Sequence, residues 1–175
     1  MKHPSQIRIW EPLLAFLLIS VGIVYAIVAF NAQDWLWFQS GATDARPSRI
    51  VIVNQGKRTT LQPGHVAFAQ LSEAVHASVG KVANTSLIDI GLSDESLAYF
   101  EDEGVLLELY YDQPVAFHVP FRVGKPTQLL IPIEGRHAGH NYFFRGANGE
   151  WWFGAMRMAD STPLYTTLQE LGYIE

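Results

Sequence analysis

One loop of the chain brings together side chains that could do chemistry. Residues 134–140, EGRHAGH, contain His137 and His140 three positions apart, a spacing that metal sites use, and Glu134 could supply a third ligand. Arg136 adds a cation beside the histidines. Two glycines make the run flexible, and no HExxH motif or second ligand cluster accompanies it. The principal interpretation is a solvated hairpin loop. A ligand contact through Arg136, His137 and His140, or a metal-dependent hydrolase site, is the alternative.

The remaining sequence lacks the motifs of the common catalytic sites. It has no cysteine, no G-x-S-x-G nucleophile elbow, and no glycine-rich loop that opens a helix to hold a phosphate. Carboxylates crowd residues 94–103, but they lack the alternating pattern of a calcium loop and fall on a helix that we expect to face water. We therefore predict a protein that is not an enzyme and that uses no cofactor or metal.

Aromatic side chains are the more informative residue class. Many of them fall on predicted strands of one sheet: Tyr110, Tyr111, Phe117, Phe121, Tyr142, Phe143, Phe144, Trp151, Trp152 and Phe153. Consecutive residues such as Trp151 and Trp152 must point to opposite faces of a sheet, so one face cannot bury them all. Either helices cover both faces, which is the default, or one face presents an aromatic patch to a partner or ligand. In the second case Trp151 or Trp152 would stack on a saccharide ring.

Hydrophobic periodicity predicts the elements that would position these residues. Alternating or β-branched apolar runs predict strands at residues 49–54, 57–61, 87–92, 105–111, 115–121, 128–133, 141–145 and 150–158. Asn148 and Gly149 predict a tight hairpin between the last two. Apolar residues three and four apart predict helices at residues 65–82, 94–102 and 163–171. Ser93 would cap the second helix and Gly104 would end it. This order predicts an α+β fold, in which two to three helices cover one face of a largely antiparallel sheet.

The longest apolar run, LLAFLLISVGIVYAIVAF at residues 13–30, carries no charge. As a helix it would span about 27 Å, close to the hydrocarbon thickness of a bilayer. It exceeds the apolar core of a signal peptide, and no suitable pair of small residues marks a cleavage point after it. We therefore predict one uncleaved transmembrane helix, a signal anchor, in preference to a cleaved signal peptide or a buried helix. Aromatic residues of the kind found at headgroup level flank the run: Trp10, Trp35, Trp37 and Phe38.

The charges that flank this run predict its orientation. Lys2 and Arg8 precede it, whereas Asp34 and Asp44 are the first charges after it and the first basic residue there is Arg46. Because basic residues stay on the cytoplasmic side, we expect the N-terminus in the cytoplasm and the domain outside it. The predicted location is the cell membrane, with a single pass.

Charge and composition exclude one class of partner. The net charge of −5 argues against nucleic acid, whose binding proteins carry basic patches. Acidic residues dominate residues 89–112 and basic residues dominate 113–149, so the two segments could face each other, face water or steer a charged partner. An exported domain without cysteine must be held together by packing alone, which fits a bacterial envelope.

These observations predict four segments: a short cytoplasmic N-terminus (1–12), a transmembrane helix (13–30), an aromatic interface segment and linker (31–48), and an extracytoplasmic α+β domain (49–175). The predicted function is protein–protein contact without catalysis, as an accessory subunit of a membrane complex or a regulator of a membrane sensor. The lipid bilayer and another membrane protein are the expected partners. The alternative is a membrane-tethered module that binds a ligand or envelope polymer through its sheet aromatics.

Overall fold

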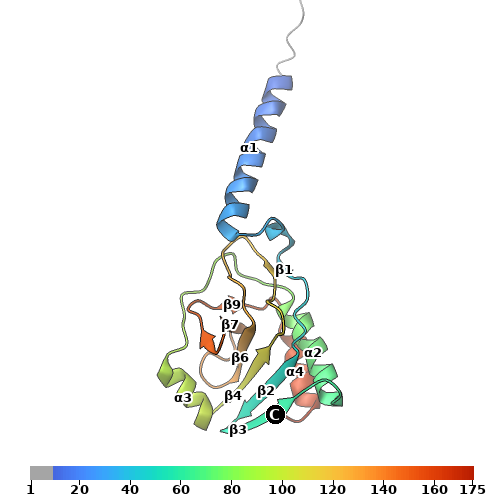
Figure 1. Cartoon of the computed structure of the whole chain (residues 1–175), viewed down its shortest axis with the longest axis vertical. Helices are drawn as coiled ribbons and strands as arrows, with labels where there is room; N and C mark the ends of the chain where they lie inside the picture. Colours follow the sequence, from blue (N-terminus) through green and yellow to red (C-terminus); the bar gives the residue numbers. More distant parts are fainter. Residues whose placement is uncertain (1–9) are drawn as a thin grey trace, which may run out of the picture.

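A long helix, α1 (Trp10–Ala32), projects from one end of the domain (Figure 1). The structure, a computed structural model, describes residues 10–175 apart from the side chain of Glu101. Lys2 and Arg8, on which the predicted orientation depends, therefore lie outside the described residues, as do the first nine residues of the predicted cytoplasmic segment. Among the described residues, α1 is the one helix long and apolar enough to cross a membrane. Its large side chains are exposed along most of its length, which is unfavourable in water and favourable in lipid.

An antiparallel sheet forms the centre of the domain. Its strand order is β3-β2-β4-β6-β7-β8, with β9 also paired to β7. A second, two-stranded pairing joins β1 to β5. The predicted α+β class with a largely antiparallel sheet is confirmed. The strands are β1 (Gly41–Ala42), β2 (Arg49–Asn54), β3 (Lys57–Leu61), β4 (Val105–Tyr110), β5 (Phe117–His118), β6 (Gln128–Glu134), β7 (Tyr142–Ala147), β8 (Glu150–Trp151) and β9 (Met156–Arg157).

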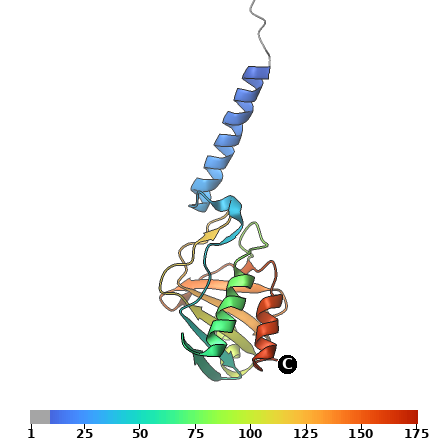
Figure 2. The ribbon, with the colours of Figure 1, turned by 90° about the vertical axis from the view of Figure 1, so that its right-hand side faces the viewer.

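Helices cover both faces of this sheet, whereas the sequence predicted them on one face. Helices α2 (Val66–Val79) and α4 (Thr162–Glu170) lie side by side on one face, as Figure 2 shows. Helix α3 (Asp94–Asp102) covers the other face, on the opposite side of the domain in Figure 1. The reason is the composition of β2 and β4, whose residues are apolar at nearly every position, so that both faces need cover.

The two faces have separate cores. The α2–α4 face buries Ile50, Ile52, Leu107, Leu109, Leu129 and Ile131 against the helices. The α3 face buries Val51, Val53, Leu106, Leu130 and Phe144 around Phe100 of α3. Glu108 also lies on the α3 face, where Arg58 pairs with it at 2.6 Å and the Tyr110 hydroxyl donates to it at 2.9 Å. A buried carboxylate needs such partners, because it has lost its contact with water.

Local signals placed several element boundaries correctly. The Ser93 hydroxyl accepts a hydrogen bond from the Ser96 N–H and so caps α3, and Gly104 follows that helix with a φ of +76°. Asn148 and Gly149 adopt positive φ in the β7–β8 turn, as a tight hairpin requires. Strands β2 and β3 have the predicted bounds.

Four predicted strands differ from the observed ones in extent, continuity or pairing. The strand predicted over residues 150–158 forms two short strands, β8 and β9, which pair with different parts of β7. Residues 87–92 form no strand; one bridge joins Ile88 to Ala155, and the segment packs over the α3 face. Residues 115–121 supply only the two residues of β5, and these pair with β1 instead of the main sheet. Strand β6 continues through Pro132 to Glu134, with Ile133 as the extra residue of a bulge between the Pro132–Leu106 and Glu134–Val105 pairs.

Candidate functional site

Residues 41–48, predicted to be part of a linker, are bonded to the domain along their length. We call this segment the strap. The Ala42 N–H donates to the Gly80 carbonyl, and the Thr43 N–H donates to the Ala116 carbonyl. Further along, Ala45 is fully buried, its N–H donates to the His76 ring at 3.2 Å, and its carbonyl accepts from the Tyr111 hydroxyl at 3.1 Å. The strap is thus part of the folded domain.

A chain of three polar side chains ties the end of α1 to the domain. The His118 Nδ1 atom lies 2.9 Å from Asp34 Oδ2, and His118 Nε2 lies 2.7 Å from the Thr43 hydroxyl. Because a carboxylate can only accept, Nδ1–H donates to Asp34, and Nε2 shares a second hydrogen bond with the Thr43 hydroxyl. Asp34 follows α1, Thr43 belongs to the strap and His118 ends β5, so one imidazole joins β5 to two segments that lie 84 and 75 residues earlier in the chain.

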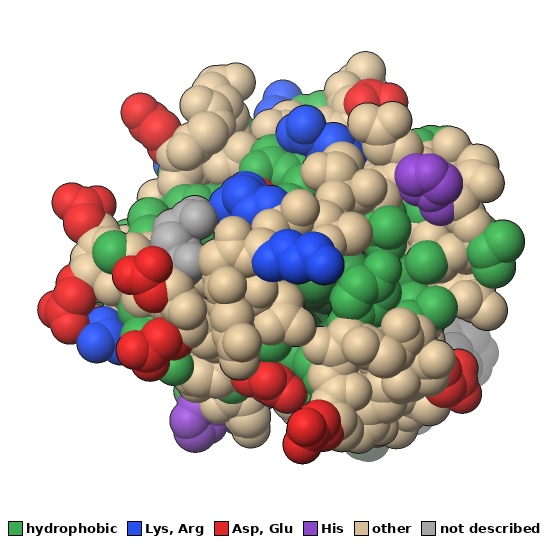
Figure 3. Space-filling view, turned by 90° about the horizontal axis from the view of Figure 1, so that it is seen from below, with side chains coloured by type: hydrophobic (Ala, Val, Ile, Leu, Met, Phe, Trp, Pro, Cys, Tyr) green, Lys and Arg blue, Asp and Glu red, His purple; other side chains and the backbone are tan. Residues whose placement is uncertain are grey.

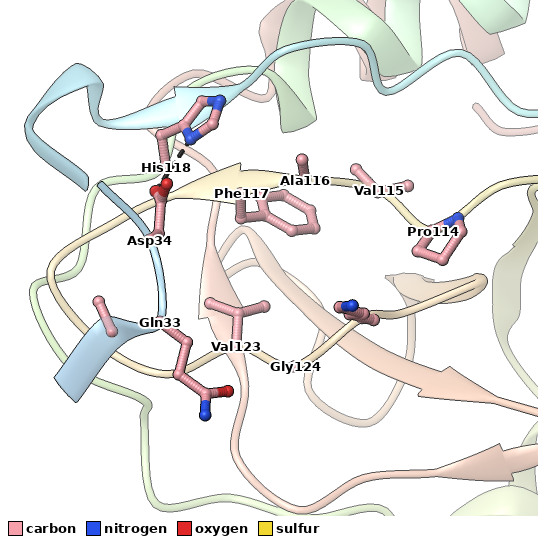
Figure 4. A pocket seen from close by; sticks show the side chains of 11 residues that line it. Gln33, Asp34, Pro114, Val115, Ala116, Phe117, His118, Val123 and Gly124 are labelled. Carbon is pink, nitrogen blue, oxygen red and sulfur yellow. Dashed lines mark hydrogen bonds and ion pairs between the residues drawn. The ribbon is translucent and has the colours of Figure 1, made fainter. Parts of the chain in front are cut away.

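A cavity of about 350 Å³ lies at the same junction (Figure 4). Residues at the end of α1 line one side of it, and two stretches of the β4–β6 connection line the other. Figure 4 shows this connection running from Phe117 past Asp34 and back to Val123 and Gly124, around the end of the helix. Its lining is half polar and half apolar: Ala32, Gln33, Asp34, Pro114, Val115, Ala116, Phe117, His118, Val123, Gly124 and Lys125.

The segment after α1 folds back along the helix. The Tyr25 hydroxyl donates to the Trp35 carbonyl at 2.6 Å, and the Tyr25 ring lies 6.0 Å from Trp35, 6.2 Å from Trp37 and 6.4 Å from Phe38. Trp35 also meets Phe30 edge to face at 5.4 Å. We call residues 35–38 the aromatic turn; its Trp35 and Phe38 rings remain more than half exposed. Three of the four predicted interface residues thus gather beside the last turns of α1, and Trp10 lies at its far end.

A carboxylate, an imidazole and a hydroxyl in this order are the arrangement of a nucleophilic catalytic triad. Asp34 and His118 line this cavity, whereas Thr43 lines an adjoining one. The two cavities share the lining residues Pro114, Val115 and Ala116. The Thr43 N–H, which could otherwise polarise a substrate carbonyl, already donates to the Ala116 carbonyl. In the structure, the bonds of this chain hold the end of α1, the strap and β5 together.

The predicted loop residues do not converge on one point. Arg136 pairs with Glu95 of α3 at 2.8 Å and lies 4.9 Å from the centre of the Tyr99 ring. His137 meets the edge of Phe144 at 5.8 Å, whereas His140 stacks on Tyr142 at 5.1 Å. Burial, with smaller contributions from the charges of Arg136 and His140, lowers the pKa of His137 below its ordinary value. No three His, Asp or Glu side chains among the described residues stand close enough together to hold a metal.

Most of the sheet aromatics lie in the two cores. Phe143 and Phe144 are fully buried on opposite faces, and Phe117 and Phe121, which were predicted on the main sheet, are buried outside it. Trp151 and Trp152 are partly buried. Trp152 follows β8, and the nearly buried guanidinium of Arg145 lies 5.7 Å from its ring centre. Phe153 is the exposed member of the set, at 66%.

Acidic side chains gather at the end of the domain away from α1. Figure 3 looks onto that end and shows them mainly on the side of α3, with a few basic side chains toward the middle. The Arg136–Glu95 pair joins the basic and the acidic segment directly. Because both partners are largely exposed, this pair adds little to stability.

The residues that form the junction gave little sign of it in the sequence. In the sequence, Asp34 is notable only as an acidic residue after the apolar run, and His118 only as a polar position in a strand pattern of alternating residues. The bond between them joins positions 84 residues apart. The spacing of apolar residues cannot predict such a contact. It indicates which face of a helix or strand a residue occupies, but not which distant segment packs against that face.

Comparison of the chain with models of protein families, with curated proteins and with solved structures finds no match.

Proposed function

We propose that the chain is a single-pass protein of the cell membrane whose domain lies outside the cytoplasm and acts without catalysis, by contact with another membrane protein. Its role would be that of an accessory subunit of a membrane complex or a regulator of a membrane sensor. The observation that carries the proposal is the junction, where an exposed apolar helix is bonded directly to the domain through the chain Asp34–His118–Thr43.

A bonded junction favours a role in which the membrane segment and the domain act together. A flexible tether would only hold the domain near the bilayer, and it would form no hydrogen bonds or strand pairing with the domain. Here the strap and the β1–β5 pairing tie the domain to the end of α1. A partner that displaces α1 in the bilayer would therefore displace the domain. A partner that binds the domain would in turn shift α1 within the bilayer.

Helix α1 offers a face on which another helix could pack. Ala15 and Gly22 stand seven residues apart, so they lie on one side of the helix, and both are exposed. A Cβ atom added at Gly22 would meet nothing within 4 Å. Small residues let helix backbones approach closely in a membrane. Ala29, further along the same side, is buried within the chain itself, which leaves the first part of the helix for a partner.

The test is co-purification of the full-length protein from its native membrane in a mild detergent, followed by mass spectrometry of the proteins that accompany it. Gly22→Ile should reduce the yield of a stoichiometric partner several-fold, because the added side chain blocks close helix approach. Val21→Ile, a change of one methylene at an exposed neighbour on another side, should leave the yield unchanged. A chain that purifies alone, or equal partner yield from both variants, would contradict helix-mediated assembly.

The alternative, a binding module for an envelope polymer, draws less support from the side chains. Saccharide sites use exposed aromatic faces, and the rings that could have formed one are largely committed to the cores. Phe153 is exposed but stands next to partly buried Trp152, and no other exposed ring adjoins it within strands β7 and β8.

A further inference from the structure

The junction cavity has features of a site for a negatively charged group. Lys125 lines the cavity, and Arg122 precedes it by three residues in the connection that passes around the end of α1 (Figure 4). Both side chains are exposed, and neither forms an ion pair with any described side chain. Lys125 thus supplies one cation in the lining itself, and Arg122 supplies a second on the same connection, outside the lining.

The single acid in the lining is already engaged. Asp34 Oδ2 accepts from His118, and Asp34 Oδ1 accepts from the Leu36 N–H at 2.9 Å. Both carboxylate oxygens therefore have donors inside the protein, and Asp34 does not compete for Lys125 through a direct bond. Asp34 keeps its negative charge, so among the described residues Lys125 is the one lining cation that a ligand can contact directly, and Arg122 on the rim would add a second.

The position of the cavity at the end of α1 indicates which kind of anionic group could reach it. The last residue of α1, Ala32, lines the cavity together with Gln33. Directly beside it, the aromatic turn packs against Tyr25 and Phe30 with exposed rings of the kind that settle at the headgroup level of a bilayer. If α1 spans the membrane, the cavity lies just outside the hydrocarbon, at the depth of the lipid phosphates.

We propose that this cavity and its rim bind the headgroup of an anionic phospholipid in the leaflet from which the domain emerges. Lys125 and Arg122 contact the phosphate, and the aromatic turn packs against the acyl chains near the glycerol. The half-apolar lining suits a headgroup and its glycerol better than a free ion. The inference rests on the proposed membrane anchoring and gives it a lipid specificity.

The test measures which lipids stay with the full-length protein. The chain is purified in mixed micelles containing equal amounts of phosphatidylcholine and phosphatidylglycerol, and the lipids it retains are quantified by mass spectrometry. Wild type should retain phosphatidylglycerol in preference to phosphatidylcholine. Lys125→Gln should reduce that preference by roughly five-fold, the contribution of one basic residue at an anionic surface, and adding Arg122→Gln should abolish it. Lys57→Gln, an exposed lysine on β3 at the other end of the domain, should have no effect.

Two outcomes overturn the inference. Equal retention of both lipids by wild type shows that no anionic headgroup is selected. Displacement of phosphatidylglycerol by millimolar inorganic phosphate shows a site for the free anion instead. Alkaline carbonate extraction of the native membranes tests the anchoring separately: release of the chain removes the membrane proposal as a whole, whereas retention without lipid preference removes only the headgroup site. Circular dichroism of the double variant checks that the fold persists.

Discussion

His118 is the residue on which the junction depends, because both of its ring nitrogens form bonds to other segments. Asp34 and His118 retain only 20% and 13% of their side-chain exposure, so water replaces either bond poorly. A hydrogen bond of this kind contributes about 1 kcal/mol net, and a buried acceptor left without its donor costs more. Glutamine could reach one partner but not both, since it lacks the rigid spacing of the two ring nitrogens.

We predict that His118→Ala loosens the junction while leaving the main sheet intact. Losing two hydrogen bonds of about 1 kcal/mol each should raise the local opening of residues 33–48 by roughly ten-fold or more. Hydrogen exchange of the full-length protein in detergent measures this, with faster exchange expected in residues 33–48 and unchanged exchange in β4 and β6. His65→Ala is the matched control, because that exposed imidazole makes no capping bond. Unchanged exchange at the strap would show that the backbone pairing alone holds the junction.

At the scale of elements, the strap is held by close packing as well as by hydrogen bonds. A Cβ atom at Gly41 would lie 2.2 Å from the Gly80 carbonyl oxygen, so β1 passes closer to the end of α2 than any other residue type allows. Further on, the hydroxyl of the partly buried Tyr111 reaches the Ala45 carbonyl, and burial raises the pKa of Tyr111 well above its ordinary value. Tyr110, which donates to Glu108, has its pKa raised to about 12, chiefly by burial.

The raised pKa values of Tyr110 and Tyr111 predict that the folded protein loses stability at alkaline pH. Their pKa values are raised on folding, so their contribution is complete below the unfolded value near pH 10 and is lost as the pH rises above it. Tyr111→Phe should lower the free energy of unfolding by about 1 kcal/mol at pH 8, because the Ala45 carbonyl loses its donor. The same variant should lose less stability than wild type between pH 10 and pH 11.5. Urea unfolding of the full-length protein in detergent, followed by tryptophan fluorescence, measures both. If the free energy of unfolding of wild type and variant fell equally over this pH range, the pKa of Tyr111 would be the same in the folded and the unfolded protein.

At the scale of the whole molecule, α1 and the domain form one elongated body with the charged end of the domain farthest from the helix (Figures 1 and 3). The polar end would then face the aqueous compartment, and the aromatic turn and junction cavity would face the bilayer. The absence of cysteine makes this arrangement easy to test, because every introduced thiol is the only one in the chain.

We predict that a thiol at Thr60, exposed on β3, is accessible from outside the cell and that a thiol at Ser5 is not. Intact cells expressing Thr60→Cys should react with a membrane-impermeant maleimide, whereas Ser5→Cys should react only after the membrane is permeabilised. The expectation follows from the basic residues before the span. The reverse pattern would place the domain in the cytoplasm, and labelling of both in intact cells would argue against a span.

The sequence by itself determined the features that depend on neighbouring residues. The apolar run, the bounds of β2 and β3, the Ser93 cap and the Asn148-Gly149 hairpin follow from local conformational preference and from the period of apolar residues. Only the tertiary structure decided what covers each face of the sheet, and so it buried the aromatics that the sequence left open as a patch. It alone joined Asp34 to His118 and turned residues 41–48 into a strap. Such contacts join segments distant along the chain, and their formation depends on how the whole chain packs, which no local pattern records.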